Sequence, residues 1–491
     1  MNAIKQNDIA AVAAMLAADP TLLETTYCTL LSSCDVSRRA TPLVVAAAYG
    51  KLEMVRYLVE QGADVHARQD DALRRSAANG HLDVVCFLVA DRGANVHAGH
   101  DDALRRSAIN GHLGVVRFLA KQGADVHAGH DDALCCSAKN GHLDIVCFLV
   151  AERGANVHAR RDEALRRSAE NGHLDVVRFL VKQGAHVHAG EDEALYLSAR
   201  NGHLDVVRFL VLEQGANVHA GQDKALRCSA ENGHLDVVRF LIKQGANVHA
   251  SEDATLRWSA ANGHLDVVRF LVVKQDVHVH AQENSALSYA AGGGHLDVVR
   301  FLVDQGTNVH AGQDEALRWS AGRGHLGVVR FLAKQGANVH ARGDDALCWS
   351  AANGHLDVVH FLVEQGADVH ARDEEALCQS ARNGHLDVVR FLLVHGAAVH
   401  KLDRAMLYRL QPALLFAEYV AILRVHDVLA ANAEKDDAVG LLSTHDPRVV
   451  LAGMVGRDVL ARLCALEGVT EETVTQWLTE IFPYNMRNNG T

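Results

Sequence analysis

Several features that define other protein classes are missing from this sequence. No apolar run is long enough to span a bilayer, so we expect no membrane association. The first residues, MNAIKQNDIAAVAAML, lack a basic region followed by a dense apolar core, so we expect no signal peptide and a cytoplasmic or nuclear protein. An excess of basic charge is missing too. The formal net charge is −12 with His neutral, which argues against a nucleic-acid partner.

Motifs for catalysis and for metal frameworks are also missing. The sequence has no Ser/His/Asp order, no Gly-rich phosphate loop and no HExxH. Its 10 cysteines include no CxxC pair, and we expect them to be reduced, unpaired thiols. We therefore expect no enzyme, no catalytic residue, no metal site and no cofactor.

What the sequence has instead is internal repetition. The decapeptide NGHLDVVRFL starts at Asn171 and starts again at Asn201. The tripeptide Gly-His-Leu recurs every 30 or 31 residues, with its His at His81, His112, His142, His173, His203, His234, His264, His295, His325, His355 and His385. A fixed period of this size indicates a chain of stacked supersecondary units.

The local signals in one unit predict two helices. Asp70 is a candidate N-cap for a short helix, ALRRSAANG, which ends at Asn79 and Gly80. HLDVVCFLVADRG predicts a second helix that ends at Gly93, and ANVHAGH predicts an extended return. One such pair cannot bury its apolar stripe alone, whereas stacked copies bury it between neighbours. The sequence therefore predicts an all-α solenoid.

The repeated segment NGHLDVVRFLVKQGAxVHA resembles the second helix and return of the ankyrin repeat. The resemblance covers roughly residues 1–400 and gives about thirteen repeats. It implies a non-catalytic scaffold that binds a protein partner through its concave face. We expect residues 1–39 to hold a degenerate first repeat with an insertion, 40–400 the array, and 401–491 a helical C-terminal region.

The chain departs from the family pattern in its loops. The period of 30 or 31 residues is shorter than the ankyrin period of about 33, so the β-fingers should be stubby. The family's His after the first-helix Leu, which ties neighbouring repeats together, is replaced. The residues in its place are Arg74, Arg105, Cys135, Arg166, Tyr196, Arg227, Arg257, Ser288, Arg318, Cys348 and Cys378. We therefore expect that hydrogen-bond ladder to be missing.

Most of the 31 histidines belong to two columns, one in the Gly-His-Leu motif and one in the return. Equivalent residues of adjacent repeats should lie about 8–10 Å apart, which is too far for shared ligation of zinc. Hydrogen bonding in loops and at helix ends is the role we expect for them. Charging them all in acid would move the net charge to about +19, so we expect acid either to loosen the array or to change its partners.

The variable position two residues after the first-helix Leu is the best candidate for partner binding. It is basic in the first half of the array and aromatic later, at Arg75, Arg106, Arg167, Trp258, Tyr289, Trp319 and Trp349. Trp, Tyr and Arg dominate the hot spots of protein interfaces. The alternative is that this column packs between repeats, as the family's equivalent Leu does.

The region 401–491 loses the period but keeps helical patterning. An open solenoid end needs a cap, which is one role for it. The alternative is an adaptor module that would make the chain the substrate-recognition subunit of a ubiquitin-ligase assembly. We expect a monomer with a protein partner of unknown identity.

Overall fold

A computed structural model describes residues 2–25, 27–28, 39–275, 277–279 and 281–397. The region 401–491, with the expected cap or adaptor, lies outside the described residues. The chain divides into two compact units, Met1–Asn247 and Val248–Thr491, and each is described by itself.

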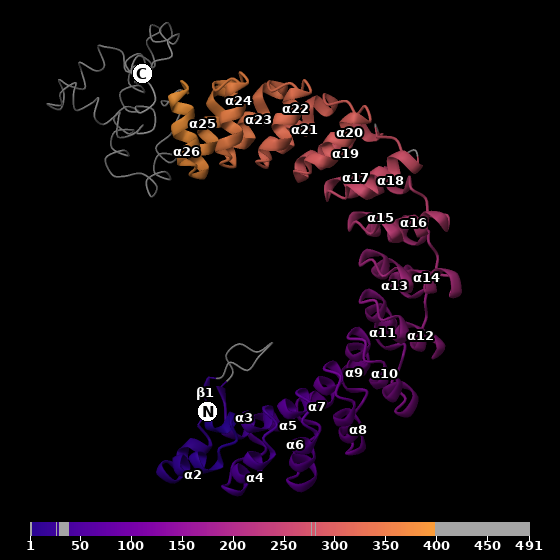
Figure 1. The fold of residues 1–491 in the computed structure, drawn as a ribbon, viewed down its shortest axis with the longest axis vertical. Helices are drawn as coiled ribbons and strands as arrows, with labels where there is room; N and C mark the ends of the chain where they lie inside the picture. Colours follow the sequence, from indigo (N-terminus) through magenta and orange to yellow (C-terminus); the bar gives the residue numbers. More distant parts are fainter. Residues whose placement is uncertain (1, 26, 29–38, 276, 280, 398–491) are drawn as a thin grey trace, which may run out of the picture. The chain divides into compact units, whose positions relative to one another are not determined.

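The first unit is a row of helix pairs (Figure 1). Its α-helices are α1 (Asn2–Lys5), α2 (Ile9–Ala18), α3 (Pro42–Ala48), α4 (Leu52–Glu60), α5 (Ala67–Ala78), α6 (Leu82–Cys86), α7 (Ala98–Ile109), α8 (Leu113–Lys121), α9 (Ala128–Lys139), α10 (Leu143–Cys147), α11 (Ala159–Glu170), α12 (Leu174–Lys182), α13 (Ala189–Arg200), α14 (Leu204–Arg208), α15 (Ala220–Glu231) and α16 (Leu235–Lys243). A 3-10 turn, η1, covers Pro20–Leu23. Two short strands, β1 (Tyr27–Cys28) and β2 (Arg39–Ala40), pair with each other in antiparallel orientation.

The second unit repeats the same helix pair. Its described helices are α17 (Ala250–Ala261), α18 (Leu265–Gln275), α19 (Ala281–Gly293), α20 (Leu296–Asp304), α21 (Ala311–Gly322), α22 (Leu326–Lys334), α23 (Ala341–Ala352), α24 (Leu356–Glu364), α25 (Ala371–Asn383) and α26 (Leu386–Val394). The two units together give thirteen pairs among the described residues, so the predicted repeat number and the all-α solenoid are confirmed.

Each repeat completes its core with residues of the next repeat. In the first unit α5 packs on α7 and α7 on α9, so first helices line up beside one another on the inner side of that unit's curve (Figure 1). Leu73 of the first helix and Val85 and Leu88 of the second are fully buried. Since each such side chain is shielded by adjacent copies, no central core is needed.

The alternation between 30 and 31 residues is absorbed at the end of the second helix. In three of the longer repeats a π-helical turn follows the α-helix, at η2 (Phe87–Asp91), η3 (Phe148–Glu152) and η4 (Phe209–Glu213). A π-turn accommodates one extra residue in a helix without ending it. The register of the next repeat is therefore kept despite the insertion.

The shortened loop contains a turn that the sequence did not reveal. Arg68, Gln69 and Asp70 are consecutive left-handed residues with φ of 58°, 61° and 52°. They lie at the start of α5 and precede its right-handed helical turns. Similar triplets begin α7, α9, α11, α13, α15, α21, α23 and α25. This turn takes the place of the missing finger tip.

The interpretation of Asp70 as a helix N-cap is wrong. Asp70 is buried, and its Oδ1 accepts hydrogen bonds from His66 Nδ1 at 3.0 Å and from the main-chain N–H of Asn95 at 3.0 Å. Asn95 lies in the return that follows α6, whereas His66 lies in the preceding return, which leads into α5. The carboxylate therefore joins two repeats instead of starting its own helix.

A hydrogen-bond ladder does join the repeats, but residues other than the family's His after the first-helix Leu supply it. The His of the Gly-His-Leu motif donates from Nε2 to a main-chain oxygen of the preceding repeat, over 2.9 to 3.1 Å in the first unit. The donors there are His81, His112, His142, His173, His203 and His234. The role expected for these histidines is thereby confirmed.

Within the described part of the chain, no helix has both the length and the apolar character needed to cross a bilayer.

Candidate functional site

The aromatic residues of the variable column lie on four successive first helices of the second unit. Trp258 on α17 and Tyr289 on α19 meet edge-on with ring centroids 5.8 Å apart, and Tyr289 meets Trp319 on α21 at 5.5 Å. Trp258 is 42% exposed and Trp349 on α23 is 36% exposed. We call these four residues the aromatic strip.

Two glycines make room for the strip. A Cβ at Gly292 would lie 3.3 Å from the Trp319 ring, and a Cβ at Gly322 would lie 3.1 Å from Cβ of Trp349. These tryptophans therefore lie against the preceding repeat, as the packing alternative requires, while the strip still presents exposed ring surface. The packing alternative therefore describes Trp319 and Trp349, and partner binding by this column stays a prediction.

A pocket of about 230 Å³ opens between Trp319 and Trp349, and Gly322, Arg323 and Asn353 also line it. The Arg323 guanidinium lies 5.9 Å from the Trp319 ring centroid and donates to the main-chain oxygen of Gly292 over 3.0 Å. The pocket thus combines two indole walls with one cation. Such a shape suits an apolar side chain with a polar neighbour.

The arginines of the same column occupy a different environment in the first unit. Arg75 bonds Asp71 at 3.4 Å, Arg106 bonds Asp102 at 2.7 Å, and Arg167 bonds Glu163 and Glu170 at 3.3 and 2.9 Å. Each guanidinium is therefore paired with a carboxylate of its own helix. Their charge is already balanced, so they are weaker candidates for a partner than the strip.

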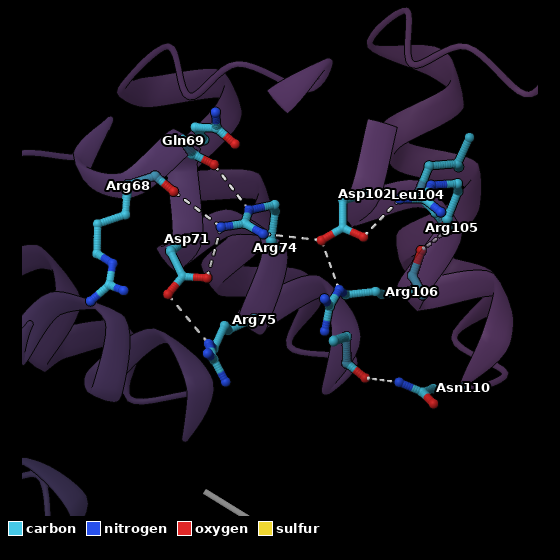
Figure 2. A network of polar contacts seen from close by, with 12 residues as sticks. Arg68, Gln69, Asp71, Arg74, Arg75, Asp102, Leu104, Arg105, Arg106 and Asn110 are labelled. Atoms are coloured by element: carbon cyan, nitrogen blue, oxygen red, sulfur yellow. Dashed lines mark hydrogen bonds and ion pairs between the residues drawn. The ribbon is translucent and has the colours of Figure 1, made fainter. Parts of the chain in front are cut away.

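The residues that replace the family's His carry a second inter-repeat link (Figure 2). Arg74 donates to the main-chain oxygens of Arg68 and Gln69 over 3.0 Å each, and it reaches Asp102 of the next repeat at 3.1 Å. Asp102 also binds Arg105 and Arg106. The guanidinium thus holds both the left-handed turn and the neighbouring repeat.

The same arrangement recurs along the array. Arg105 reaches Asp132 at 3.0 Å and Arg166 reaches Glu193 at 2.8 Å in the first unit. Arg318 reaches Asp345 at 3.1 Å in the second unit, where both side chains are almost fully buried. The network is structural, because every described member faces another residue of the chain.

One group of histidines departs from the expected spacing. His158, Asp162 and His186 place one ligand atom each within 4.8 Å of one another, and they are the sole group of three such residues found among the described residues. We expected no metal site because equivalent histidines of adjacent repeats, in one column, lie too far apart to share an ion. His186 belongs to neither column: it stands where most other repeats carry Asp or Asn, which was the available signal in the sequence.

The cysteines whose side chains the structure describes are free thiols, as expected. Burial raises the pKa of Cys135 to about 12, and burial likewise raises the pKa of Cys348 to about 12. Both are therefore protonated at neutral pH. A protonated, buried thiol is a poor nucleophile and a poor metal ligand.

Comparison with known proteins finds one family. The family model described as ankyrin repeats (3 copies) matches residues 1–100, 95–161, 165–252, 217–283, 256–343, 308–373 and 339–403. No curated protein matches the chain significantly. Among solved structures, the human ASB11 ankyrin repeat domain is similar, with 25% sequence identity and a TM-score of 0.38, over 42% of this chain and 99% of that chain.

Proposed function

The chain belongs to the ankyrin repeat family, whose members generally mediate protein–protein interaction, and on that premise we propose that it is a non-catalytic scaffold that binds a protein partner through the aromatic strip. The strip lies on the first helices, which line the inner, concave side of the second unit (Figure 1). The observation that carries the proposal is the exposure of Trp258 and Trp349 on one face.

Exposed tryptophan is the main support, because large apolar side chains are otherwise mostly hidden. The exposed large apolar residues among the described ones are Met15, Leu82, Leu212, Trp258, Val273 and Trp349. Two of these six share one column, and they flank Tyr289 and Trp319. A cluster of rigid aromatic residues is the usual composition of an interface hot spot.

The pocket indicates what the partner offers. An apolar side chain inserted between Trp319 and Trp349 would bury indole surface on both sides, and Arg323 would favour a carboxylate or carbonyl oxygen beside it. A segment with an apolar residue next to an acidic one therefore fits best. The arginines Arg75, Arg106 and Arg167 stay secondary candidates for contacts with the same partner.

The test compares partners of the full chain and of a variant that carries Trp258→Ala, Trp319→Ala and Trp349→Ala. A second variant with Leu212→Ala and Val273→Ala removes two other exposed apolar side chains and serves as the control. Affinity purification followed by mass spectrometry should lose a reproducible partner with the tryptophan variant only. Identical partner lists for all three proteins would remove the strip from consideration.

Folding of the tryptophan variant must be verified separately, because Trp319 and Trp349 lie against Gly292 and Gly322. A milder variant with Trp258→Ala alone changes the most exposed ring of the strip. It should weaken binding of the same partner while the circular dichroism spectrum stays unchanged.

A further inference from the structure

One position of the return distinguishes a single repeat of the first unit. The residue two places before the return His is Asp or Asn in all but one of that unit's repeats, and it is His186 in the exception. The equivalent residues of the first unit are Asp64, Asn95, Asp125, Asn156, Asn217 and Asn247. His186 places a second imidazole beside a carboxylate that already contacts the imidazole of the return His.

The carboxylate concerned is Asp162 at the start of α11, which is 3% exposed. His158 Nδ1 lies 3.0 Å from its Oδ1, and His186 Nδ1 lies 3.6 Å from its Oδ2. The two imidazole rings are stacked, with centroids 4.3 Å apart. The two Nδ1 atoms therefore face the two oxygens of the same carboxylate.

The geometry suits a transition-metal ion. Zinc binds imidazole nitrogen and carboxylate oxygen at about 2.0–2.2 Å, so the ligand atoms of one site lie about 3–4 Å apart. The two separations between an imidazole Nδ1 and the carboxylate, 3.0 and 3.6 Å, fall in this range, and all three ligand atoms lie within 4.8 Å of one another. Two imidazoles and one carboxylate form a ligand set used by zinc and other divalent transition metals.

The carboxylate is also oriented by the main chain. The N–H of His186 donates to Asp162 Oδ1 over 2.8 Å, which fixes the plane of the carboxylate. A hydrogen bond of this kind to a ligating group is what fixes ligand orientation in metal sites. His186 is mostly exposed and lines an open hollow of about 620 Å³ together with Val181 and Gln214, so solvent reaches its imidazole.

We propose that His158, Asp162 and His186 bind one divalent transition-metal ion, of which zinc is the representative, with water in the open position. His158 and Asp162 come from the start of one repeat and His186 from the return that leads to the next. The ion would therefore clamp two successive repeats of the first unit. Its role is structural or regulatory, since the chain offers no further catalytic group there.

The remaining His–Asp pairs of the described residues provide the internal comparison. His127 with Asp131 and His219 with Asp223 have the same first contact, at 2.9 and 3.0 Å, but carry no second imidazole. They form two-ligand groups and should not retain metal. His278 occupies the same column as His186 in the second unit, yet within the described part of the chain it joins no such group.

The test measures zinc bound per chain in the untagged full-length protein. Samples are loaded with excess Zn²⁺, desalted, and analysed for metal content. We expect the wild type to hold one zinc more per chain than His186→Asn. That variant should fold normally, because Asn occupies the equivalent position at Asn156, Asn217 and Asn247. His130→Asn, which removes an exposed His elsewhere in the first unit, is the matched control and should retain the wild-type content.

Two further readouts separate this site from adventitious binding by other histidines. Zn²⁺ should raise the melting temperature of the wild type and of His130→Asn, and it should not raise that of His186→Asn. Co²⁺ should give d–d absorption bands that disappear in the same variant. Equal metal content and equal thermal shifts in wild type and His186→Asn would overturn the proposal.

A gain-of-site variant tests whether the three groups suffice. Asn247 donates its main-chain N–H to Asp223 over 2.8 Å, as His186 does to Asp162. Asn247→His in the His186→Asn background should therefore restore one zinc per chain, with His219 as the partner imidazole. If the metal content of this variant does not rise, two imidazoles and one carboxylate in this arrangement do not suffice to bind zinc.

Discussion

At the residue scale, the Gly-His pair works between repeats as well as within one. Gly141 has φ of +79°, and a Cβ there would lie 2.5 Å from Nδ1 of His173 in the next repeat. His173 in turn donates to the main-chain oxygen of Lys139 over 2.9 Å. Gly141 thus ends the first helix in a left-handed conformation, and its missing side chain leaves the space that the His173 imidazole occupies.

Substituting this glycine should therefore have two effects. Gly184 also has a positive φ, +95°, but no atom lies within 4 Å of its ideal Cβ. Gly184→Ala should lower the free energy of unfolding by roughly 1–2 kcal/mol through backbone strain alone. Gly141→Ala should lower it by about 1–3 kcal/mol more, because the imidazole must move. Urea unfolding measures the free energy of unfolding of both variants. Equal losses would contradict the claim that the His173 imidazole packs directly against Gly141.

Two histidines of the same column predict a pH dependence. Burial lowers the pKa of His112 and of His325 below the ordinary 6.5. The folded chain therefore binds fewer protons than the unfolded chain below this pH. Their contribution to stability is complete above pH 6.5 and is lost as the pH falls through 6.5 and then through the lowered pKa.

We accordingly expect the urea midpoint to fall between pH 7.5 and pH 5. In a variant with His112→Gln and His325→Gln the fall should be smaller, since Gln keeps a donor and does not titrate in this range. The midpoint is measured by circular dichroism at both pH values. The same fall in the wild type and the variant would show that these imidazoles are not its source.

At the element scale, the left-handed turn accounts for the short period. In α21 the turn places Gly312, Gln313 and Asp314 in this conformation, which costs roughly 1–2 kcal/mol for each of the two non-glycine residues. The strain is offset by fixed hydrogen bonds: Arg318 donates to the main-chain oxygens of Gly312 and Gln313 over 2.9 and 3.0 Å. The replacement of the family's His by Arg thus goes together with the shortened loop.

Removing this guanidinium should cost more where it also forms a buried ion pair. Arg318 is 3% exposed and pairs with Asp345, which keeps Arg372 as a second partner at 2.8 Å. We expect Arg318→Ala to lower the free energy of unfolding by about 3 kcal/mol. Arg227→Ala, which removes one bond to the Gly221 main-chain oxygen, should cost about 1 kcal/mol. Denaturant titration measures both, and a larger loss for Arg227→Ala would contradict this ranking.

The sequence predicted the helices well and the loops poorly. Apolar periodicity and the Asn-Gly stop placed α5 and α6 correctly, because both signals act within one helix. The role of Asp70 was missed because its partner, Asn95, lies 25 residues further along the chain, in the return after α6. His186 was missed for a similar reason: its importance depends on the neighbouring Asp162, which only the stacking of repeats brings close.

At the scale of the whole molecule, stability comes from nearest-neighbour interfaces repeated along each unit. Leu73, Val85 and Leu88 are buried between adjacent copies, and the bonds of Asp70 and His81 connect successive repeats. In such an array the free energy of unfolding is approximately a sum of repeat and interface terms. The period itself made this architecture predictable, whereas the identity of the partner depends on a few exposed side chains.

The most direct test of this account is the removal of one whole repeat. Deleting Asn110–Lys139 joins Ile109 to Asn140 and leaves the repeat pattern uninterrupted. We predict a folded chain with unchanged helicity per residue and a modestly lower urea midpoint, because each broken inter-repeat contact can form again with the next copy. Loss of helicity or of a cooperative unfolding transition would contradict the claim that each repeat depends only on its neighbours.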